Sequence, residues 1–532
     1  MIKQIGLQRY DLNKKEIFVS LSIIGIIGLF LRLYFEPQIA LTGDATNYFV
    51  YAVDTSLKGK LSDVYFLANS GWSIFLSVIF SMTQLDDPLF LMELQRYVSI
   101  FISVFTIIPV YFLCRKFFNI QYSLIGAALF VFEPHVVINS TLGITESIYL
   151  FLGISSLTLF LSTNKKLEYL SFTFAALFTI IRIEGLLFFM IISILFFVKH
   201  RNEKKSFLKY PIMLLIFSLI LLPVAYGNFE AHQRDGFVSE LMDYNKASYM
   251  HFIEGIPDTD DHLYGDKETA NIQNFISNGI KNTIWIFGVF SIPLFFVLVP
   301  IGFFTILKNR NNFKISFKVL TMFFVTLTML VGSFYMYARG IEDVRFLFMT
   351  IPILIIISVY GISRLKIRDR LYIIFVIIGL IAITSFLYVD SKKIDHDYEN
   401  EVFFISKFIV ERTDVINSDS ADIRYRTAAG IIAEWPELPI ATHETHVERG
   451  LKLISPIEYD SLEKFIHDSK NQGLTHLAVD GRDNQPEFLR DVFYHSEDYD
   501  YLLEIFDSKE YQMNYHVKIF EIYYENIELI EE

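Results

Sequence analysis

Long apolar runs recur along residues 1–389, and no other feature constrains the fold as strongly. A helix needs about 20 apolar residues to cross a bilayer, and "IFVSLSIIGIIGLFLRLYF" at 17–35 is a run of that kind. With 53% apolar residues and 53 Phe, the chain carries more apolar mass than soluble domains do. The pattern predicts a polytopic α-helical membrane protein. We expect about eleven spans, at residues 17–35, 96–114, 122–138, 147–162, 169–181, 186–198, 207–225, 284–307, 316–338, 346–362 and 371–389.

The basic residues set the orientation of these spans. Short segments such as "RKFFN" at 115–119 and "KHRNEKKSFLK" at 199–209 lie on one side and hold most of the Lys and Arg of the membrane part. Cytoplasmic loops carry such an excess. The N-terminus is therefore predicted to be cytoplasmic, and the long loops 36–95 and 226–283 to be extracytoplasmic. The stretch "GWSIFLSVIFSM" at 71–82 is too short to span, so we expect it to lie along the membrane surface.

Residues 390–532 have a different character. They include 32 acidic and 14 basic residues, a net charge of −18, which leaves +5 for residues 1–389. Runs typical of strands, such as "LTHLAVDG" and "HVKIFEIYY", alternate with helical patterns such as "YDSLEKFIHDSKNQG". We expect an acidic extracytoplasmic α/β domain here, with the last two strands forming a hairpin. Its acidity excludes nucleic acid as a partner, because Lys and Arg are needed to neutralise phosphates.

Ionisable residues gather at one depth, at the extracytoplasmic ends of the predicted spans. Such groups are stable near lipid when they are paired or face a wet cavity. Carboxylates take up protons or bind cations, and arginines bind phosphate in a bidentate manner. The mixture suits a reaction on a lipid-linked phosphate. The candidate residues are Asp44, Glu146, Arg182, Glu184, Arg339, Asp343 and Arg345.

Each candidate also has a structural interpretation, which stays open at this point. Arg182 and Glu184, two residues apart, could form a plain interfacial ion pair. Glu146 could cap the fourth span, and Asp44, after a glycine, could belong to a turn. The two arginines before the tenth span could extend to lipid headgroups. His135, near the end of the third span, is more often a packed side chain than a ligand, and it is kept as a candidate site-lining residue.

Sequence patterns of common soluble enzymes are missing. The chain has no HExxH, no CxxC pair, no Walker loop and no GxSxG, so metalloprotease, nucleotide and serine-hydrolase chemistry gain no support. Its one cysteine, Cys114, ends an apolar run and is predicted to be a buried thiol.

Four segments resemble, in order and spacing, those of the GT-C glycosyltransferases, in particular the protein mannosyltransferase and aminoarabinose transferase group. "GDATNYF" at 43–49 resembles the acidic motif of the group's first loop. "EPHVVINSTLGITESIYLFLGISSLTLF" at 133–160 resembles its third span, short outer turn and fourth span. "FTIIRIEGLLFF" at 178–189 resembles its R-x-E-G segment, and "DVRFLFMTIPILIIISVYGI" at 343–362 resembles its late Arg- and Pro-containing span. The resemblance covers roughly residues 21–361.

The resemblance implies a membrane glycosyltransferase that takes a sugar from a polyprenyl (dolichyl) phosphate and inverts the anomeric centre in one displacement. The acceptor would be a hydroxyl of a protein, lipid or glycan at the extracytoplasmic face. By position, Asp44 would be the catalytic base, and Glu146 would assist it. If a divalent cation such as Mg²⁺ or Mn²⁺ is present, these two carboxylates would hold it. Arg339 or Arg345 would bind the lipid phosphate, and the remaining candidates would line the site.

The chain departs from the group's pattern at two positions. Thr145 precedes Glu146 where many relatives have Asp, which leaves metal dependence open. Ala45 follows Asp44 where protein mannosyltransferases have Glu, so a Ser/Thr-protein acceptor is not implied. The oligosaccharyltransferase branch carries a Trp-Trp-Asp-Tyr-Gly motif. None of the three Trp of this chain is adjacent to another, which ranks that branch lower.

Two other classes of function compete with an enzyme. A transporter needs ionisable groups or paired helix breaks near the bilayer midplane. The predicted spans are almost free of charge inside, and their Gly and Pro residues show no paired interruption. An anchor or receptor for the acidic domain needs one or two spans, and eleven exceed that requirement. The sequence therefore favours the glycosyltransferase.

Overall fold

The computed structural model describes residues 12–526 with gaps. The gaps are 38–40, 42, 64–65, 84–87, 204–205, 241, 243–271, 309–315, 365–370, 394–396, 398–399, 402–403, 406–407, 409–411, 413–414, 418–451, 455, 457–458 and 481–485. Most of the predicted middle loop, 226–283, therefore lies outside the described residues.

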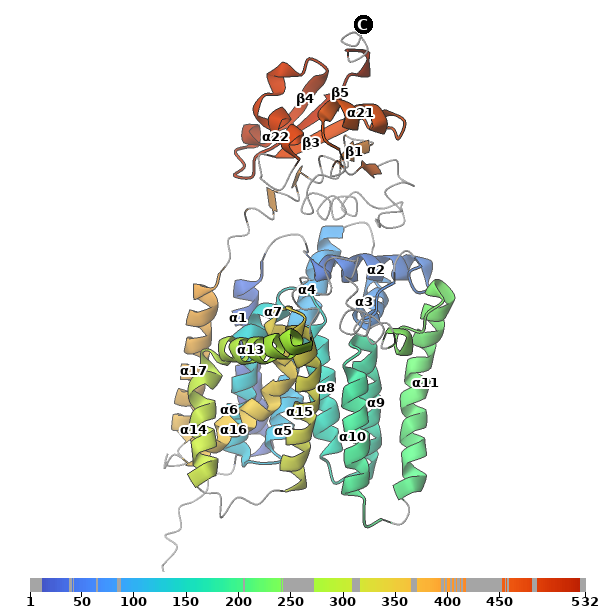
Figure 1. The fold of residues 1–532 in the computed structure, drawn as a ribbon. Coiled ribbons are helices and arrows are strands. Elements are labelled where there is room, and N and C mark those ends of the chain that lie inside the picture. The colour runs from blue at the N-terminus through green and yellow to red at the C-terminus, as the bar shows by residue number, and fades with distance from the viewer. Residues whose placement is uncertain are drawn as a thin grey trace, which may run out of the picture. The chain divides into compact units, whose positions relative to one another are not determined.

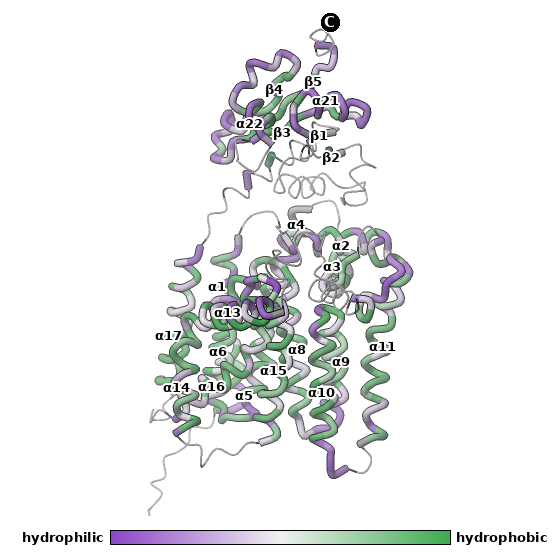
Figure 2. Tube along the Cα trace, in the orientation of Figure 1, coloured by the Kyte–Doolittle hydropathy of each residue, from purple (hydrophilic) through white to green (hydrophobic). Residues whose placement is uncertain are grey.

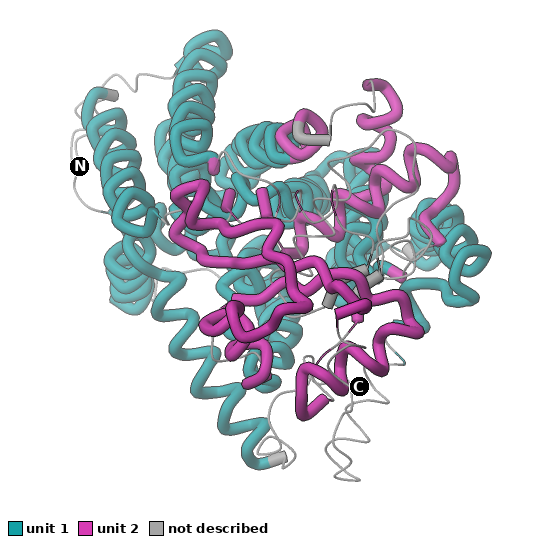
Figure 3. Tube along the Cα trace, turned by 90° about the horizontal axis from the view of Figure 1, so that it is seen from above, with its two compact units in different colours: residues 1–36, 67–72, 96–393 teal, residues 37–66, 73–95, 394–532 magenta. Residues whose placement is uncertain are grey.

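The chain folds into two compact units (Figure 3). The first unit comprises Met1–Glu36, Leu67–Trp72 and Arg96–Lys393, and the second comprises Pro37–Phe66, Ser73–Gln95 and Ile394–Glu532. The second unit thus takes most of the predicted first loop as well as the acidic C-terminal residues. Figure 2 shows hydrophobic residues dominating the helices of the first unit.

The first unit is helical (Figure 1). Four of its helices begin with an Asn or Ser side chain that accepts a backbone N–H, namely Asn13, Asn119, Asn164 and Ser316. The elements are α1 (Lys14–Phe35), α4 (Pro88–Phe105, from Arg96 on), α5 (Ile107–Cys114), α6 (Ile120–Val131), α7 (Pro134–Ser140), α8 (Glu146–Phe160), α9 (Lys165–Ile181), α10 (Gly185–Lys199), α11 (Ser206–His232), α13 (Ile272–Ser291), α14 (Leu294–Lys308), α15 (Phe317–Ala338), η3 (Val344–Thr350), α16 (Ile351–Arg364) and α17 (Leu371–Ser391).

The prediction of a polytopic helical membrane fold is confirmed, although the number of spans is not. Among the described residues, six helices are long and apolar enough to cross a membrane, or eight if two bent helix pairs each count as one span. The predicted spans 147–162 and 186–198 are α8 and α10, apolar helices of 15 residues each. At 1.5 Å per residue these are shorter than a bilayer core.

Two of the predicted spans are broken. The first break separates α6 from α7, which are bent by 50°, and the second separates α13 from α14, which are bent by 103°. Pro134 is the first residue of α7, and Pro293 lies between α13 and α14. A proline removes a backbone donor and so favours a break. The spans predicted at 122–138 and 284–307 therefore each correspond to a bent pair of helices.

A buried arginine occupies the first of these breaks. Arg32, near the end of α1, is completely buried. Its guanidinium donates to the Val131 carbonyl that ends α6, at 2.9 Å, and to the hydroxyls of Ser103 and Ser140. On the other side of the break, the Glu133 carboxylate accepts the Val136 N–H at 2.7 Å and so caps α7. The interior of the predicted spans therefore contains at least two ionisable side chains, Arg32 and Glu133, although the sequence pattern predicted it to be almost free of charge.

Glycines bring two helices of the first unit into close contact. A Cβ on Gly302 of α14 would lie 2.1 Å from the Ile357 carbonyl oxygen of α16, and one on Gly361 of α16 would lie 2.8 Å from the Gly302 Cα. Small residues at facing positions are typical of tightly packed helices in membranes.

The second unit contains a small α/β fold and two helices of the first loop. Its sheet has the order β2-β1-β3-β5-β4, with β1 parallel to β2 and β3, and β5 antiparallel to β3 and β4. The hairpin predicted for the last two strands is confirmed as β4–β5. The elements are α2 (Asp44–Lys58), α3 (Gly71–Phe80, from Ser73 on), β1 (Val415–Asn417), β2 (Lys452–Ile454), α21 (Leu462–Lys470), β3 (His476–Asp480), α22 (Glu487–Tyr494), η4 (Ser496–Asp498), β4 (Leu502–Asp507), η5 (Ser508–Tyr511) and β5 (Val517–Ile522).

Candidate active site

Glu146 is the centre of an ion-pair network in the first unit. It is the first residue of α8 and is 2% exposed. Its Oε1 accepts a hydrogen bond from Arg182 Nη1 at 2.8 Å, and Arg345 Nη1 lies 3.7 Å from the same oxygen. The neighbouring Thr145 hydroxyl donates to Oε2 at 3.3 Å. Two guanidinium groups beside a buried carboxylate hold it in a fixed orientation.

Arg182 joins Glu146 to Glu184. It follows α9 directly, and its Nη2 donates to Glu184 Oε1 at 2.7 Å. Its guanidinium also lies 5.1 Å from the ring centre of Tyr149 and 5.6 Å from that of Phe346. Burial alone raises the pKa of Glu184, but the Arg182 charge outweighs that effect and holds the pKa below its usual range. Arg182 is therefore engaged by two carboxylates and two aromatic rings.

Arg345 and Asp343 form the other side of the network. Asp343 precedes η3, and its carboxylate accepts both the backbone N–H of Arg345, at 2.8 Å, and the Nε–H of the same residue, at 2.5 Å. The Arg345 side chain is 25% exposed and is therefore partly accessible from outside the protein. Its planar group suits a phosphate.

Two further predicted site residues, Arg339 and His135, are buried in the first unit. Arg339 ends α15 and is buried, with its guanidinium 5.6 Å from the Tyr335 ring centre. His135 is buried in α7 and packs against the rings of Phe290 and Tyr388, as its structural interpretation predicts.

Asp44 belongs to the second unit, where it is the first residue of α2. It is exposed, and Gly43 before it has φ +54°, a conformation that favours glycine. A carboxylate in the first turn interacts favourably with the helix dipole. Asp44 therefore lies in a turn, as its structural interpretation predicts, and this turn is the start of α2.

Sequence reasoning missed the aromatic part of the site. Tyr149 lies three residues after Glu146 on α8, a spacing that puts both side chains on one helix face. That spacing could have singled out Tyr149 beforehand. Phe346 follows Arg345 in η3, and no spacing in the sequence links it to Arg182.

The surroundings of Glu146 do not fit a divalent cation. Within the part of the chain that the structure describes, no group of three or more His, Cys, Asp or Glu side chains could hold a metal ion. The Glu146 carboxylate faces two guanidinium groups, whose charges oppose the approach of a cation. A role for Mg²⁺ or Mn²⁺ therefore finds no support at this carboxylate.

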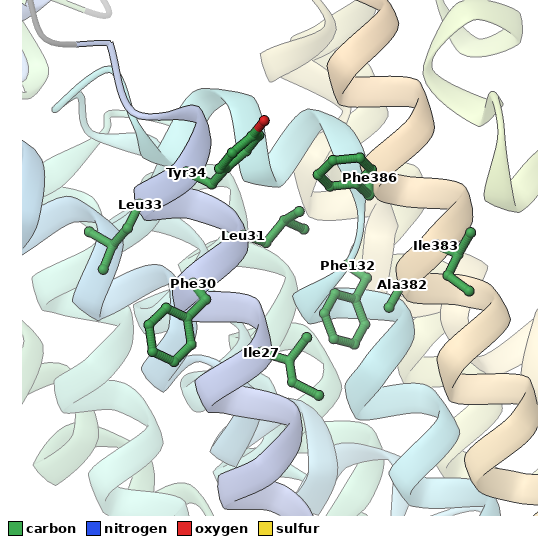
Figure 4. Close-up of a pocket in the computed structure, with 9 residues that line it drawn as sticks. All are labelled: Ile27, Phe30, Leu31, Leu33, Tyr34, Phe132, Ala382, Ile383 and Phe386. Atoms are coloured by element: carbon green, nitrogen blue, oxygen red, sulfur yellow. The ribbon is translucent and has the colours of Figure 1, made fainter.

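An apolar cavity of about 710 Å³ lies elsewhere in the first unit, between α1 and α17 (Figure 4). Leu31, Phe132 and Ala382 are among the side chains that line it, and Tyr34 contributes a hydroxyl. None of its lining residues belongs to the Glu146 network. It is open at the surface, since Phe30 is 66% and Tyr34 64% exposed, and its lining is almost wholly apolar.

The comparison with solved structures decides the fold. ArnT from Cupriavidus metallidurans, bound to undecaprenyl phosphate, is similar over 96% of this chain and 98% of its own, with a TM-score of 0.56 and 8% identity. The oligosaccharyltransferase from Archaeoglobus fulgidus, in complex with Zn and sulfate, is similar over 87% of this chain and 68% of its own, with a TM-score of 0.51 and 13% identity.

The chain has the GT-C fold. This confirms the fold that the sequence resemblance implied. A further similar structure is the archaeal oligosaccharyltransferase AglB from Archaeoglobus fulgidus, in complex with an inhibitory peptide and a dolichol-phosphate. It has a TM-score of 0.50 and 12% identity over 87% of this chain and 69% of its own. No family model and no curated protein sequence matches the chain.

Proposed function

We propose that this chain is a membrane glycosyltransferase that moves a sugar from a polyprenyl phosphate to an acceptor hydroxyl. The observation that carries the proposal is the network of Glu146, Arg182 and Arg345, built on a GT-C fold. Two of the similar structures hold a polyprenyl phosphate, undecaprenyl phosphate in ArnT and dolichol-phosphate in AglB. A lipid-phosphate leaving group needs cationic partners, and Arg345 brings a partly exposed cationic side chain to the network.

In the proposed reaction, the Asp44 carboxylate takes the proton of the acceptor hydroxyl. The freed oxygen attacks the anomeric carbon from the face opposite the phosphate. The bond between that carbon and the phosphate oxygen breaks, and polyprenyl phosphate leaves with the electron pair. The sugar therefore inverts at this carbon. The base works on an oxygen that becomes more acidic as the new bond forms.

The residues of the network have separate roles in this scheme. Arg345, whose other edge is held by Asp343, binds the leaving phosphate, and Arg339 is the second candidate for that contact. Arg182 orients Glu146 and does not bind the phosphate, since its donors already face Glu146 and Glu184. Glu146 orients the sugar or the acceptor through its remaining lone pairs.

The proposal includes a topology. The N-terminus is cytoplasmic, and the active site and residues 390–532 are extracytoplasmic, with the boundary after residue 389. Basic residues in the short loops on the other side support this orientation. The acidic α/β domain is then available to select the acceptor, whether that is a protein, a lipid or a glycan.

Sugar transfer in proteoliposomes tests the proposal. The intact chain is offered a panel of polyprenyl-phosphate sugars, beside Asp44→Asn and the matched control Asp63→Asn, another exposed carboxylate of the first loop. Transfer that is lost in Asp44→Asn and kept in Asp63→Asn is expected. Equal transfer by the intact chain and both variants would support the enzyme class but would mean that a residue other than Asp44 is the base. No transfer from any donor removes the proposal.

A transporter is the second candidate, and the two broken spans favour it. At the first break, however, Arg32 and Glu133 bond to the free backbone groups and so close the break. The same liposomes separate the two functions. A transporter moves the labelled lipid between leaflets and leaves its sugar bond intact, whereas the enzyme releases the sugar from its phosphate.

A further inference from the structure

The two turns that carry Glu146 and Arg182 are bound by a third segment, Gly71–Trp72. Trp72 has no exposed surface, and its indole Nε1–H donates to the Gly143 carbonyl at 2.9 Å. Gly143 lies three residues before Glu146 and has φ +74°, so this turn has an unusual backbone that only a glycine adopts without strain. The indole therefore fixes the turn from which α8 starts.

Gly71 brings the same segment against the other turn. A Cβ on Gly71 would lie 2.5 Å from the carbonyl oxygen and 2.6 Å from the carbonyl carbon of Ile180. Ile180 is in the last turn of α9, two residues before Arg182. Both atoms are backbone and move only with the helix, so any residue larger than glycine at 71 has to push the end of α9 away.

Gly185 makes the second turn equally tight. A Cβ there would lie 2.5 Å from the backbone N of Thr179. The α9–α10 turn is therefore closely packed within itself. Helix α9 also packs directly against α8, with the ring centres of Tyr149 and Phe178 4.8 Å apart, and a further connection between the two turns adds to that packing. Apart from the Arg182–Glu146 ion pair, Gly71–Trp72 supplies such a connection, with a hydrogen bond to one turn and backbone contact with the other.

We propose that Trp72 is a positioning residue for the Glu146–Arg182 pair, with Gly71 as the spacer that permits its approach. In this role Trp72 acts through the two turns and not on the substrate. It fixes the distance between two turns, and an ion pair across them keeps one geometry only while both are fixed. The catalytic consequence of this role rests on the proposed function, whereas the structural part does not.

Hydrogen–deuterium exchange on the intact chain tests the structural part. Trp72→Phe is expected to increase exchange of the backbone amides at 141–147 and 180–185 at least several-fold and to leave α16 unchanged. Trp285→Phe, at an exposed tryptophan of α13, is the matched control and should change neither turn. Unchanged exchange at both turns in Trp72→Phe overturns the proposal, whatever the activity.

A variant that keeps the shape of the indole distinguishes the loss of the hydrogen bond from a folding defect. Replacing Trp72 by 3-benzothienylalanine removes the N–H donor and retains the ring size. This variant is expected to fold and to show the increase at 141–147 alone. Gly71→Ala is expected to increase hydrogen–deuterium exchange mainly at 180–185 and less at 141–147. Gly379→Ala, where a Cβ meets nothing within 4 Å, is its control and should alter neither turn.

Kinetics test the catalytic part. Trp72→Phe is expected to lower kcat about 10-fold or more with little change in KM for the donor, because a misplaced network loses transition-state stabilisation. In a Glu146→Gln background the same change should lower kcat by less than 2-fold, since the residue it positions is gone. Equal effects in both backgrounds overturn the positioning role. If the unmodified chain transfers no sugar, the proposed function fails, and the exchange result still decides the structural part.

Discussion

Arg182 and Glu146 form a 2.8 Å ion pair although 36 residues separate them in the chain. The Arg182 side chain is 12% exposed and the Glu146 side chain 2%. Such a pair is costly to break, because removing one partner leaves the other charge buried without compensation. The pair therefore links the stability of the first unit to the geometry of its candidate site.

Arg182→Gln is expected to lower the free energy of unfolding by about 3–5 kcal/mol, because both Glu146 and Glu184 lose their shared cation. The triple variant that also carries Glu146→Gln and Glu184→Gln should recover most of that loss. Denaturant unfolding of the purified chain in detergent measures both. Additive losses in the triple variant would contradict a coupled network.

Arg345→Gln is expected to weaken binding of polyprenyl phosphate about 10-fold or more, because a charged hydrogen bond to phosphate contributes about 1.5–3 kcal/mol. Arg345→Lys should recover only part of the affinity, since an ammonium cannot bind in the same planar manner. Binding of the lipid to the intact chain in nanodiscs measures this. Arg364→Gln, at the exposed end of α16, serves as the control and should bind as the unmodified chain does.

Gly302→Ala is expected to destabilise the packing of α14 on α16 by about 1–3 kcal/mol, because the new methyl group meets the Ile357 carbonyl oxygen at 2.1 Å. Gly379→Ala in α17 adds the same methyl group to open space and should be neutral or slightly stabilising. Unfolding midpoints of the two variants in the same detergent give the comparison. Equal midpoints would show that α14 and α16 move apart freely.

His495 is expected to titrate above the usual histidine range. Its Nδ1–H donates to the Asp491 carboxylate at 2.9 Å, and this hydrogen bond raises the pKa of His495. The hydroxyl of Tyr499 first, and His495 second, lower the pKa of Asp491. The His495 contribution to stability is complete below its unfolded pKa and is lost as pH rises through the folded pKa. The Asp491 contribution is lost in the opposite direction, as pH falls.

Exchange of the His495 C2 hydrogen in the intact chain, followed by mass spectrometry, measures that pKa. Asp491→Asn should shift the midpoint of His495 downward, toward the ordinary value of about 6.5. His467, exposed beside Asp468, provides an internal reference in both samples. A midpoint of His495 that is equal with and without the Asp491 carboxylate would contradict the hydrogen bond.

The sequence identifies most of the residues of the network because they share one property. Glu146, Arg182, Glu184, Asp343 and Arg345 all lie in turns on the same predicted side of the membrane. Antiparallel helices bring such turns together without further information. The sequence could not show which of these residues pair, since pairing depends on how α8, α9 and η3 pack.

The broken spans could not be predicted, because proline has more than one effect in these helices. Pro134 and Pro293 accompany breaks, whereas Pro211, Pro223 and Pro300 lie inside continuous helices. An average of hydropathy over a span does not distinguish the two situations. What differs is whether the freed backbone groups find partners, as the Val131 carbonyl finds Arg32.

Arg32 has a consequence for the biosynthesis of the chain. The ribosome delivers α1 first, and on this helix the Arg32 guanidinium has the Gly28 carbonyl as an acceptor. Its other acceptors, on Ser103, Val131 and Ser140, are made about 70 to 110 residues later. A charge without partners is unfavourable in lipid. The first helix therefore cannot complete its hydrogen bonds until α7 has been synthesised, and its docking is tied to the assembly of the later helices.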